Sequence, residues 1–156
     1  MKTKRWQIAL LGALLPVALG LGARAFGEVH AYHRAQALQQ QAGQYLQQGN
    51  RQQALDCLQQ AIDTYPHFLE LYQDKADIYI VKHQWKEALA CWDQALKICP
   101  EASPGLGLCR RQRALILTQM GRLEEARQDA RVALTIDPHD GQAKGLLAAL
   151  EKQPRQ

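Results

Sequence analysis

The sequence predicts an all-α protein: a solenoid of three helical hairpins, closed by a C-terminal capping helix and preceded by one N-terminal transmembrane or signal helix. Three observations support this prediction. Segments with the periodicity of amphipathic helices alternate with short turns along residues 28–152. Small residues recur at fixed distances before three prolines. An apolar run from Trp6 to Ala23 follows a basic N-terminus.

The repeat is defined by the residues that precede Pro66, Pro100 and Pro138. Counted back from each proline, alanine recurs at three fixed offsets and a large side chain recurs at a fourth. The interval from Pro100 to Pro138 is longer than the one from Pro66 to Pro100, which indicates a four-residue insertion at Ser103–Leu106. In chain order, the repeat residues are Ala42, Tyr45, Ala54 and Ala61; Ala76, Tyr79, Ala88 and Ala95; and Ala114, Leu117, Ala126 and Ala133.

The period from Pro66 to Pro100, with small, aromatic and proline positions in this order, resembles the tetratricopeptide repeat (TPR). The resemblance divides the chain into repeats over residues 35–68, 69–102 and 103–140, the third with the insertion, and a capping helix with a tail over residues 141–156. It implies that each repeat is a pair of antiparallel helices. It also implies that the first helix of each pair lines a concave groove, which holds a peptide or helix of a partner protein.

The turn residues predict where the helices end. Gly49 and Gly121 supply the left-handed backbone that ends a helix, whereas the second repeat has His83 at this position, a choice that costs free energy. Proline after the second helix of each repeat prevents its continuation. We expect one helix over residues 28–48 and later helices near Arg51–Asp63, Leu69–Val81, Trp85–Lys97, Gly107–Gln119, Arg122–Thr135 and Asp140–Lys152.

Residues 1–25 have two competing interpretations. A basic start at residues 2–5 precedes the apolar run Trp6–Ala23, whose length suffices for an uncleaved membrane anchor. The same segment fits a secretory signal peptide, cleaved after Ala25 at an A-x-A sequence. In both cases the basic start stays in the cytoplasm, so we expect the repeats on the periplasmic or lumenal side of a membrane. Residues 26–34 would form a helical stalk.

Charge and motifs argue against nucleic-acid binding and catalysis. Residues 1–34 carry the whole net charge of +4, whereas residues 35–156 hold equal numbers of basic and acidic side chains. The basic balance therefore does not indicate a nucleic-acid partner, and the basic cluster at residues 110–113 is expected to be a solvated helix face. Phosphate-binding loops, nucleophile elbows and C-x-x-C pairs are absent, and His30 with His33 does not make a metal site. The sequence predicts no enzyme, no cofactor and no metal.

The repeat register also predicts which residues face the groove. Glu70, Asp74 and Asp77 follow one another at helical spacing, which places them on one stripe, and we expect them to recognise basic groups of the partner. Two alternatives stay open: a solvated face, or an internal ion pair with Arg111. The groove is then neutral in the first repeat (Gln36, Gln39, Gln40, Gly43 and Gln47), acidic in the second (Glu70, Gln73, Asp74 and Asp77) and basic in the third (Leu108, Arg111, Gln112 and Leu115).

Heat-shock chaperone tails are not expected as partners. TPR proteins that hold these acidic tails clamp them with lysine, asparagine and arginine side chains. The matching positions carry none of the required types, and Asp74 would repel a carboxylate. These positions are Gln39, Gly43, Asp74, Leu108 and Gln112.

The four cysteines offer one candidate disulfide. Cys57 and Cys91 occupy equivalent positions in neighbouring repeats, about one helix diameter apart, which exceeds the roughly 7 Å limit between the α-carbons of a disulfide. Cys99 and Cys109 flank the insertion and could close it as a small loop. The alternative for this second pair is two unpaired, partly buried thiols.

The sequence therefore predicts a non-enzymatic adaptor at a membrane, which binds a partner segment in its concave groove. The resemblance to small anchored TPR proteins connects this role with assembly of a membrane complex. Two alternatives stay open. The chain could be a structural subunit of a membrane protein complex, or a cleaved, soluble periplasmic binding module.

Overall fold

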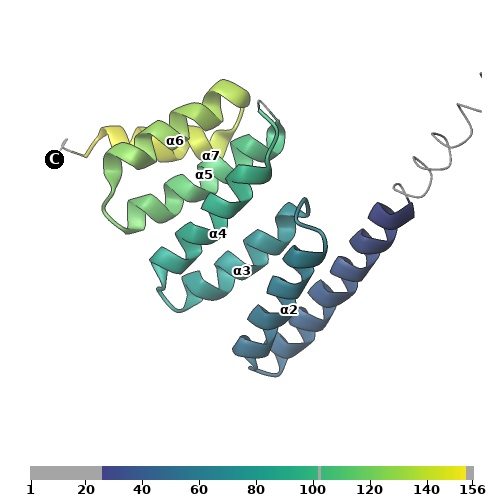
Figure 1. Cartoon of the computed structure of the whole chain (residues 1–156). Coiled ribbons are helices and arrows are strands. Elements are labelled where there is room, and N and C mark those ends of the chain that lie inside the picture. Colours follow the sequence, from purple (N-terminus) through teal and green to yellow (C-terminus); the bar gives the residue numbers. More distant parts are fainter. Residues whose placement is uncertain (1–25, 102, 154–156) are drawn as a thin grey trace, which may run out of the picture.

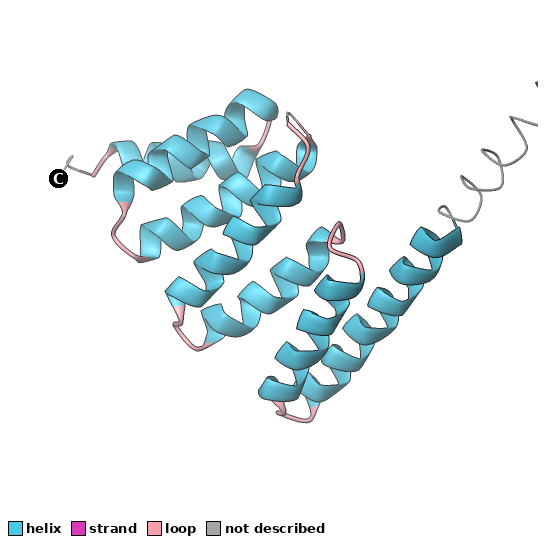
Figure 2. Cartoon of the chain, viewed as in Figure 1, coloured by secondary structure: helices cyan, strands magenta, loops and turns pink. Residues whose placement is uncertain are grey.

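The structure, a computed structural model, describes residues 26–101 and 103–153, and within them it contains helices and turns but no strand (Figure 2). A first helix occupies residues 26–47. The helices that follow are α2 (Arg51–Thr64), α3 (Leu69–Val81), α4 (Trp85–Ile98), α5 (Pro104–Gln119), α6 (Leu123–Ile136) and α7 (Gly141–Glu151). The predicted all-α class is confirmed.

Successive helices run in alternating directions, so the first helix with α2, α3 with α4, and α5 with α6 form three hairpins stacked in a row (Figure 1). Helix α7 covers the last hairpin at the C-terminal end of the row. Arg127 of α6 fixes its end by donating hydrogen bonds to the carbonyl oxygens of Leu150 and Gln153, at 2.7 and 2.8 Å. Each hairpin buries on its neighbour a face that it could not bury alone.

The repeat residues form the core of this stack. The alanines at the three recurring positions are all buried, in every hairpin. With no side chain beyond Cβ, they let neighbouring helix backbones approach, and larger side chains fill the remaining space. Leu58, Leu71, Trp92 and Leu117 are buried in this way. The sequence pattern is therefore a packing pattern.

The three hairpin turns share one backbone geometry. Gly49, His83 and Gly121 have φ values of 80°, 55° and 74°, in the left-handed region. This geometry lets the next residue donate its N–H to a carbonyl oxygen five positions earlier, which satisfies a helix C-terminus. The pairs are Asn50 with Tyr45 (2.8 Å), Gln84 with Tyr79 (2.9 Å) and Arg122 with Leu117 (2.9 Å).

Helix α5 begins before the predicted start at Gly107, because the insertion extends this helix. Ser103 is its N-cap: the Ser103 Oγ accepts a hydrogen bond from the N–H of Leu106 at 3.2 Å, and Pro104 occupies the first helical position. Serine at the cap and proline after it are favourable because both fit the unsatisfied first turn. The extra residues thus form a helical turn rather than a loop closed by a disulfide, and Cys99 and Cys109 are the unpaired thiols of the second alternative.

The start of the first helix packs against the turn between α2 and α3 rather than standing free. The ring of Tyr32 packs against those of Tyr65 and Phe68, with centroid distances of 5.6 and 5.3 Å. The stalk expected over residues 26–34 is helical, but part of it belongs to the packed domain. In the part of the chain that the structure describes, no helix combines the length and apolar character that a membrane span requires. The predicted anchor or signal peptide at residues 1–25 lies outside the described residues.

Candidate functional site

A cavity of about 430 Å³ opens between the first helix (residues 26–47), α2 and α3. It lies where the repeat register places the groove, since the first helices of two neighbouring hairpins supply most of its lining. The lining residues are Gln39, Ala42, Gly43, Leu46, Arg51, Leu58, Asp74, Asp77, Ile78 and Val81. The cavity has an apolar part and an acidic part.

The apolar part is open because Gly43 contributes no side chain. A Cβ added at Gly43 would meet no atom within 4 Å. Leu46 is 38% exposed and Val81 is 66% exposed, so two large apolar side chains border this space while remaining accessible. Exposed apolar surface of this kind is available to bury part of a partner.

The acidic part consists of Asp74 and Asp77 on α3. Gln39 reaches across from the first helix and donates its Nε2 hydrogen to Oδ2 of Asp74 at 2.6 Å. Burial raises the pKa of Asp77, and the neighbouring charge of Asp74 raises it further. Among the described residues, neither carboxylate forms an ion pair, although Arg51 lines the same cavity. A cationic group of a partner would therefore relieve a repulsion that the chain itself leaves in place.

The other predicted groove residues of the first two repeats lie on the same helices but outside this cavity. Glu70 is exposed near the start of α3, and Gln36 and Gln73 are partly buried. The stripe of three carboxylates is thus divided: Asp74 and Asp77 share the cavity, and Glu70 does not line it.

Arg111 does not pair with the acidic stripe. Its Nη1 contacts Oδ2 of Asp140 at 2.7 Å, and Asp140 also caps α7 by accepting hydrogen bonds from the N–H groups of Gln142 and Ala143. Burial opposes the ionised form of Asp140, yet the Ala143 N–H and the Arg111 guanidinium outweigh it, so the pKa of Asp140 is lowered. The predicted basic end of the groove is therefore neutralised. Leu108 and Gln112 are partly buried there, and Leu115 is exposed.

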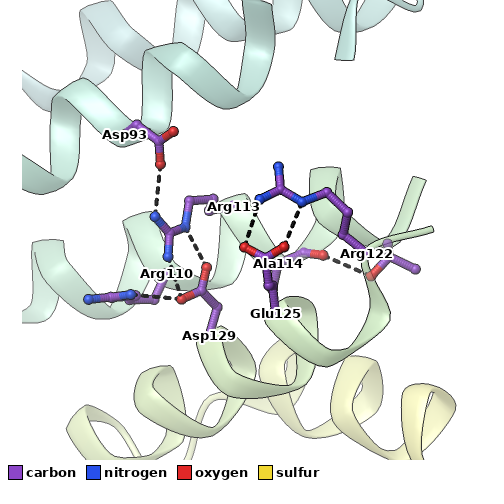
Figure 3. A network of polar contacts seen from close by, with 8 residues as sticks. Asp93, Arg110, Arg113, Ala114, Arg122, Glu125 and Asp129 are labelled. Atoms are coloured by element: carbon purple, nitrogen blue, oxygen red, sulfur yellow. Dashed lines mark hydrogen bonds and ion pairs between the residues drawn. The ribbon is translucent and has the colours of Figure 1, made fainter. Parts of the chain in front are cut away.

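The expectation that residues 110–113 form a solvated face is also wrong. Figure 3 shows Arg110 and Arg113 of α5 converging on Asp129 of α6. Arg110 Nη1 lies 2.8 Å from Oδ1 of Asp129, and Arg113 Nε lies 2.5 Å from Oδ2. Arg113 Nη1 also contacts Oδ1 of Asp93 on α4 at 2.8 Å. The hydrogen bond to Asp129, the largest influence, raises the pKa of Arg113 despite its burial. The contacts with Asp129 join the two helices of the third hairpin, and the contact of Arg113 with Asp93 links this hairpin to the second one.

Sequence reasoning missed the apolar border of the cavity. Val81 stands one repeat period after Gln47, a position that the register already assigned to the groove. Applying the period once more would have placed Val81 there as well. Leu46 and Ile78 had no comparable signal, because an apolar residue on a helix is usually assigned to the core.

Metal-binding geometry is not found in the part of the chain that the structure describes. No three His, Cys, Asp or Glu side chains gather there as a metal ion would require. The cavity is lined by apolar side chains, the Gln39 amide, the Arg51 guanidinium and two carboxylates.

The repeats match known protein families in sequence. Sequence models of the tetratricopeptide repeat match residues 36–67 and 68–139. A search of curated proteins found no match.

Solved structures are similar in fold. The first TPR of Spaghetti (RPAP3), bound to the HSP90 peptide SRMEEVD, is 21% identical with a TM-score of 0.64, over 78% of this chain and 93% of that one. The second TPR domain of human RPAP3, in complex with the HSP70 peptide SGPTIEEVD, is 21% identical with a TM-score of 0.64, over 79% and 99%. The N-terminal domain of stress-induced protein-1 from C. elegans is 17% identical with a TM-score of 0.67, over 78% and 98%.

Proposed function

We propose that this chain, which belongs to the tetratricopeptide repeat family, is a non-enzymatic adaptor that binds a segment of another protein in its concave groove. TPR domains typically mediate protein–protein interaction, and two of the similar structures hold peptides of HSP90 and HSP70. The observation that carries the proposal for this chain is the cavity between the first helix and α3, which combines accessible apolar side chains with two carboxylates.

The chemistry of the cavity defines the kind of segment that fits. An apolar side chain of the partner would fill the space above Gly43, against Leu46 and Val81. A lysine or arginine beside it would reach Asp74 and Asp77, because opposite charges steer association and fix the register of a bound segment. The proposed ligand is therefore a protein segment with adjacent apolar and basic residues.

Acidic chaperone tails are the contrasting ligand. The peptides in the two RPAP3 complexes end in Glu-Glu-Val-Asp. In this chain, Asp74 and Asp77 occupy the groove and Arg111 is paired with Asp140. An acidic tail would meet the like charges of Asp74 and Asp77 and no free cation at Arg111. Arg51 is a single cation against these two carboxylates, so we propose that such tails are poor ligands.

A steric block tests the groove without changing charge. Peptides that bind the full chain would first be selected from a random peptide library. Gly43→Leu should weaken their binding at least tenfold, because leucine fills the space that glycine leaves open. Gly145→Leu is the matched control: Gly145 also lies in a helix with no atom within 4 Å of an added Cβ, but outside the cavity.

Neither substitution should destabilise the fold, so a change in peptide affinity can be assigned to the cavity. Leucine is a better helix former than glycine by roughly 0.8 kcal/mol, so both variants should melt no lower than the parent. Equal affinity of the parent and the Gly43→Leu variant for the selected peptides would contradict the groove assignment. The convex face would then become the candidate surface.

The membrane context is a further part of this proposal. The apolar run in residues 1–25 would anchor or export the chain, with the repeats on the periplasmic or lumenal side and a role in assembling a membrane complex. Phe26 and Val29, 74% and 55% exposed, extend this apolar character into the described helix. A structural subunit remains the alternative, and it would co-purify with its complex in stoichiometric amount at high salt.

Fractionation tests the membrane proposal. Membranes washed with carbonate should retain a full-length chain that begins at Met1, because an uncleaved apolar helix stays in the bilayer. The measurement is the intact mass of the protein in the washed membranes and in the supernatant. A soluble protein with Phe26 as its first residue would establish the cleaved binding module instead.

A further inference from the structure

Two cysteine side chains meet at the junction between the second and third hairpins. The Sγ atoms of Cys99 and Cys109 lie 3.6 Å apart. Cys99 is the residue that follows α4, and Cys109 lies within α5. Neither thiol takes part in the groove described above, and all four described cysteines are free thiols. The adaptor function therefore assigns no role to these two adjacent thiols.

The local structure favours contact between these two sulfurs. The insertion turns the chain directly into α5, with Ser103 as its cap, and so returns Cys109 to the end of α4. Gly105 keeps this junction tight: a Cβ there would lie 2.8 Å from Cδ1 of Leu69 and 3.9 Å from the Sγ of Cys99. A side chain at this position would make the Leu69 side chain turn aside and would touch the Cys99 thiol at an ordinary contact distance.

The two thiols differ in access. Cys109 is fully buried, whereas Cys99 is partly exposed and lines a cleft of about 310 Å³ together with His67, Leu69, Ile98, Pro100 and Ser103. A reagent can therefore reach Cys99 but not Cys109. Burial, and then the hydrogen bond with Cys99, raise the pKa of Cys109 to about 12, which disfavours its thiolate as the first nucleophile.

We propose that Cys99 and Cys109 are a redox-active dithiol, which a small-molecule disulfide or a disulfide oxidoreductase converts into an intramolecular disulfide. The S–S bond of about 2.0 Å requires the sulfurs to approach by roughly 1.5 Å from their present separation. Cys99 provides this movement, because it lies outside the helix in an extended conformation, with φ −74° and ψ 127°. Its side chain can turn while Cys109 stays fixed in α5.

The reaction consists of two exchange steps. The Cys99 thiol loses its proton, and its sulfur attacks one sulfur of the oxidising disulfide, which breaks and releases one thiolate. The Cys109 sulfur, also deprotonated, then attacks the Cys99 sulfur and releases the second thiolate. The two released thiolates take up the two protons. The protein dithiol loses two electrons, and the oxidising disulfide is reduced to two thiols.

The cross-link would fix the end of α4 to α5 and so lock two hairpins at their junction. The junction between the first and second hairpins cannot form this cross-link, because the residue equivalent to Cys99 in the first repeat is Tyr65. Closing a chain segment restricts the unfolded state, so the oxidised form should melt at a higher temperature than the reduced form.

Trapping the intermediate tests the proposal. The full chain is incubated under native conditions with oxidised glutathione, and the products are identified by intact mass and peptide mapping. The parent should lose two hydrogen atoms and yield one cross-linked peptide pair containing Cys99 and Cys109. Cys109→Ala should instead carry one glutathione on Cys99. Cys99→Ser should carry none on Cys109, because that thiol is buried.

Cys91→Ala provides the control, since Cys91 is a buried thiol of the same α4 helix. It should cross-link as the parent does, and the rise in melting temperature on oxidation should appear in the parent and in this control but not in Cys99→Ser. Glutathione on both Cys99 and Cys109 of the parent, a cross-link to Cys57 or Cys91, or no oxidation of the native chain would each overturn the proposal.

Discussion

His83 holds a backbone conformation that glycine holds in the other two hairpin turns. Its φ of 55° lies in the left-handed region, where a side chain brings Cβ close to the following carbonyl group. The turn nevertheless keeps the bond from the Gln84 N–H to the Tyr79 carbonyl at 2.9 Å. The hydrogen-bonding requirement of the helix end therefore prevails over the local preference of histidine.

Replacing His83 by glycine should stabilise the protein. The change removes a steric cost of roughly 1–2 kcal/mol at a left-handed residue, offset in part by the greater flexibility of glycine in the unfolded chain. It also removes a ring contact with Trp85 at 5.5 Å. We expect a net gain of about 0.5–1 kcal/mol in the free energy of unfolding, measured by urea denaturation. Gly121→Ala, the reverse change in the third turn, should destabilise; a loss of stability in His83→Gly would contradict this account.

Helix α5 carries the arginines that form ion pairs with the neighbouring helices α4 and α6. Asp129 of α6 is only 1% exposed, and it accepts hydrogen bonds from both Arg110 and Arg113. Arg113 continues to Asp93 of α4, so one guanidinium connects three helices (Figure 3). An ion pair buried in this way stabilises mainly because losing one member leaves the other charges uncompensated.

Asp129→Asn should therefore destabilise the protein strongly. It leaves Arg110 and Arg113 facing a neutral amide in a buried position, and breaking such a network costs about 3–5 kcal/mol. Glu125→Gln is the matched control, because the Glu125–Arg122 pair is exposed and adjacent on the same hairpin. The control should leave thermal unfolding nearly unchanged. Similar melting temperatures for the two variants would show that the network around Asp129 does not stabilise the third hairpin.

The helices of the structure agree closely with the ranges predicted from the sequence. Most helix boundaries were predicted to within a residue, because alanine periodicity and turn residues are local signals. The start of α5 was not, since Ser103 and Pro104 were interpreted as a loop rather than as a cap and first turn. The roles of Arg111 and Arg113 could not be predicted either, because their partners Asp140 and Asp129 are distant in the chain and come close only when the hairpins pack.

The candidate site was predictable only in part for the same reason. The register indicated Gln39, Gly43, Asp74 and Asp77, which all line one cavity. The cavity itself depends on how closely two hairpins pack, and this distance depends on many side chains together. The division of the acidic stripe at Glu70 therefore became visible only in three dimensions.

At the scale of the whole molecule, charge pairing sets the character of the groove. The arginines of α5 are bound to carboxylates of α4, α6 and the cap of α7. Asp74 and Asp77 form no ion pair among the described residues, and they border the accessible apolar cavity. The lining of this cavity thus holds two carboxylates without an ion-pair partner against one cation, Arg51, next to apolar surface; a net negative groove is the central claim of the proposed function.

A double substitution at these two carboxylates tests that claim most directly. Peptides selected on the full chain are titrated at low salt against the parent, against Asp74→Asn with Asp77→Asn, and against a control with Asp56→Asn and Asp63→Asn. The control removes two exposed carboxylates of α2, each accepting a hydrogen bond from a glutamine of the same helix, outside the cavity. Screening is weakest at low salt, so the contribution of charge is largest there.

The account predicts that the selected peptides carry lysine or arginine beside an apolar residue. Their affinity should fall about three- to tenfold in the Asp74/Asp77 variant, as expected for two partly exposed charge contacts, and stay unchanged in the Asp56/Asp63 control. The difference should disappear at high salt. Selected peptides without basic residues, or equal affinities of the two variants at low salt, would contradict the claim that this cavity recognises a basic segment.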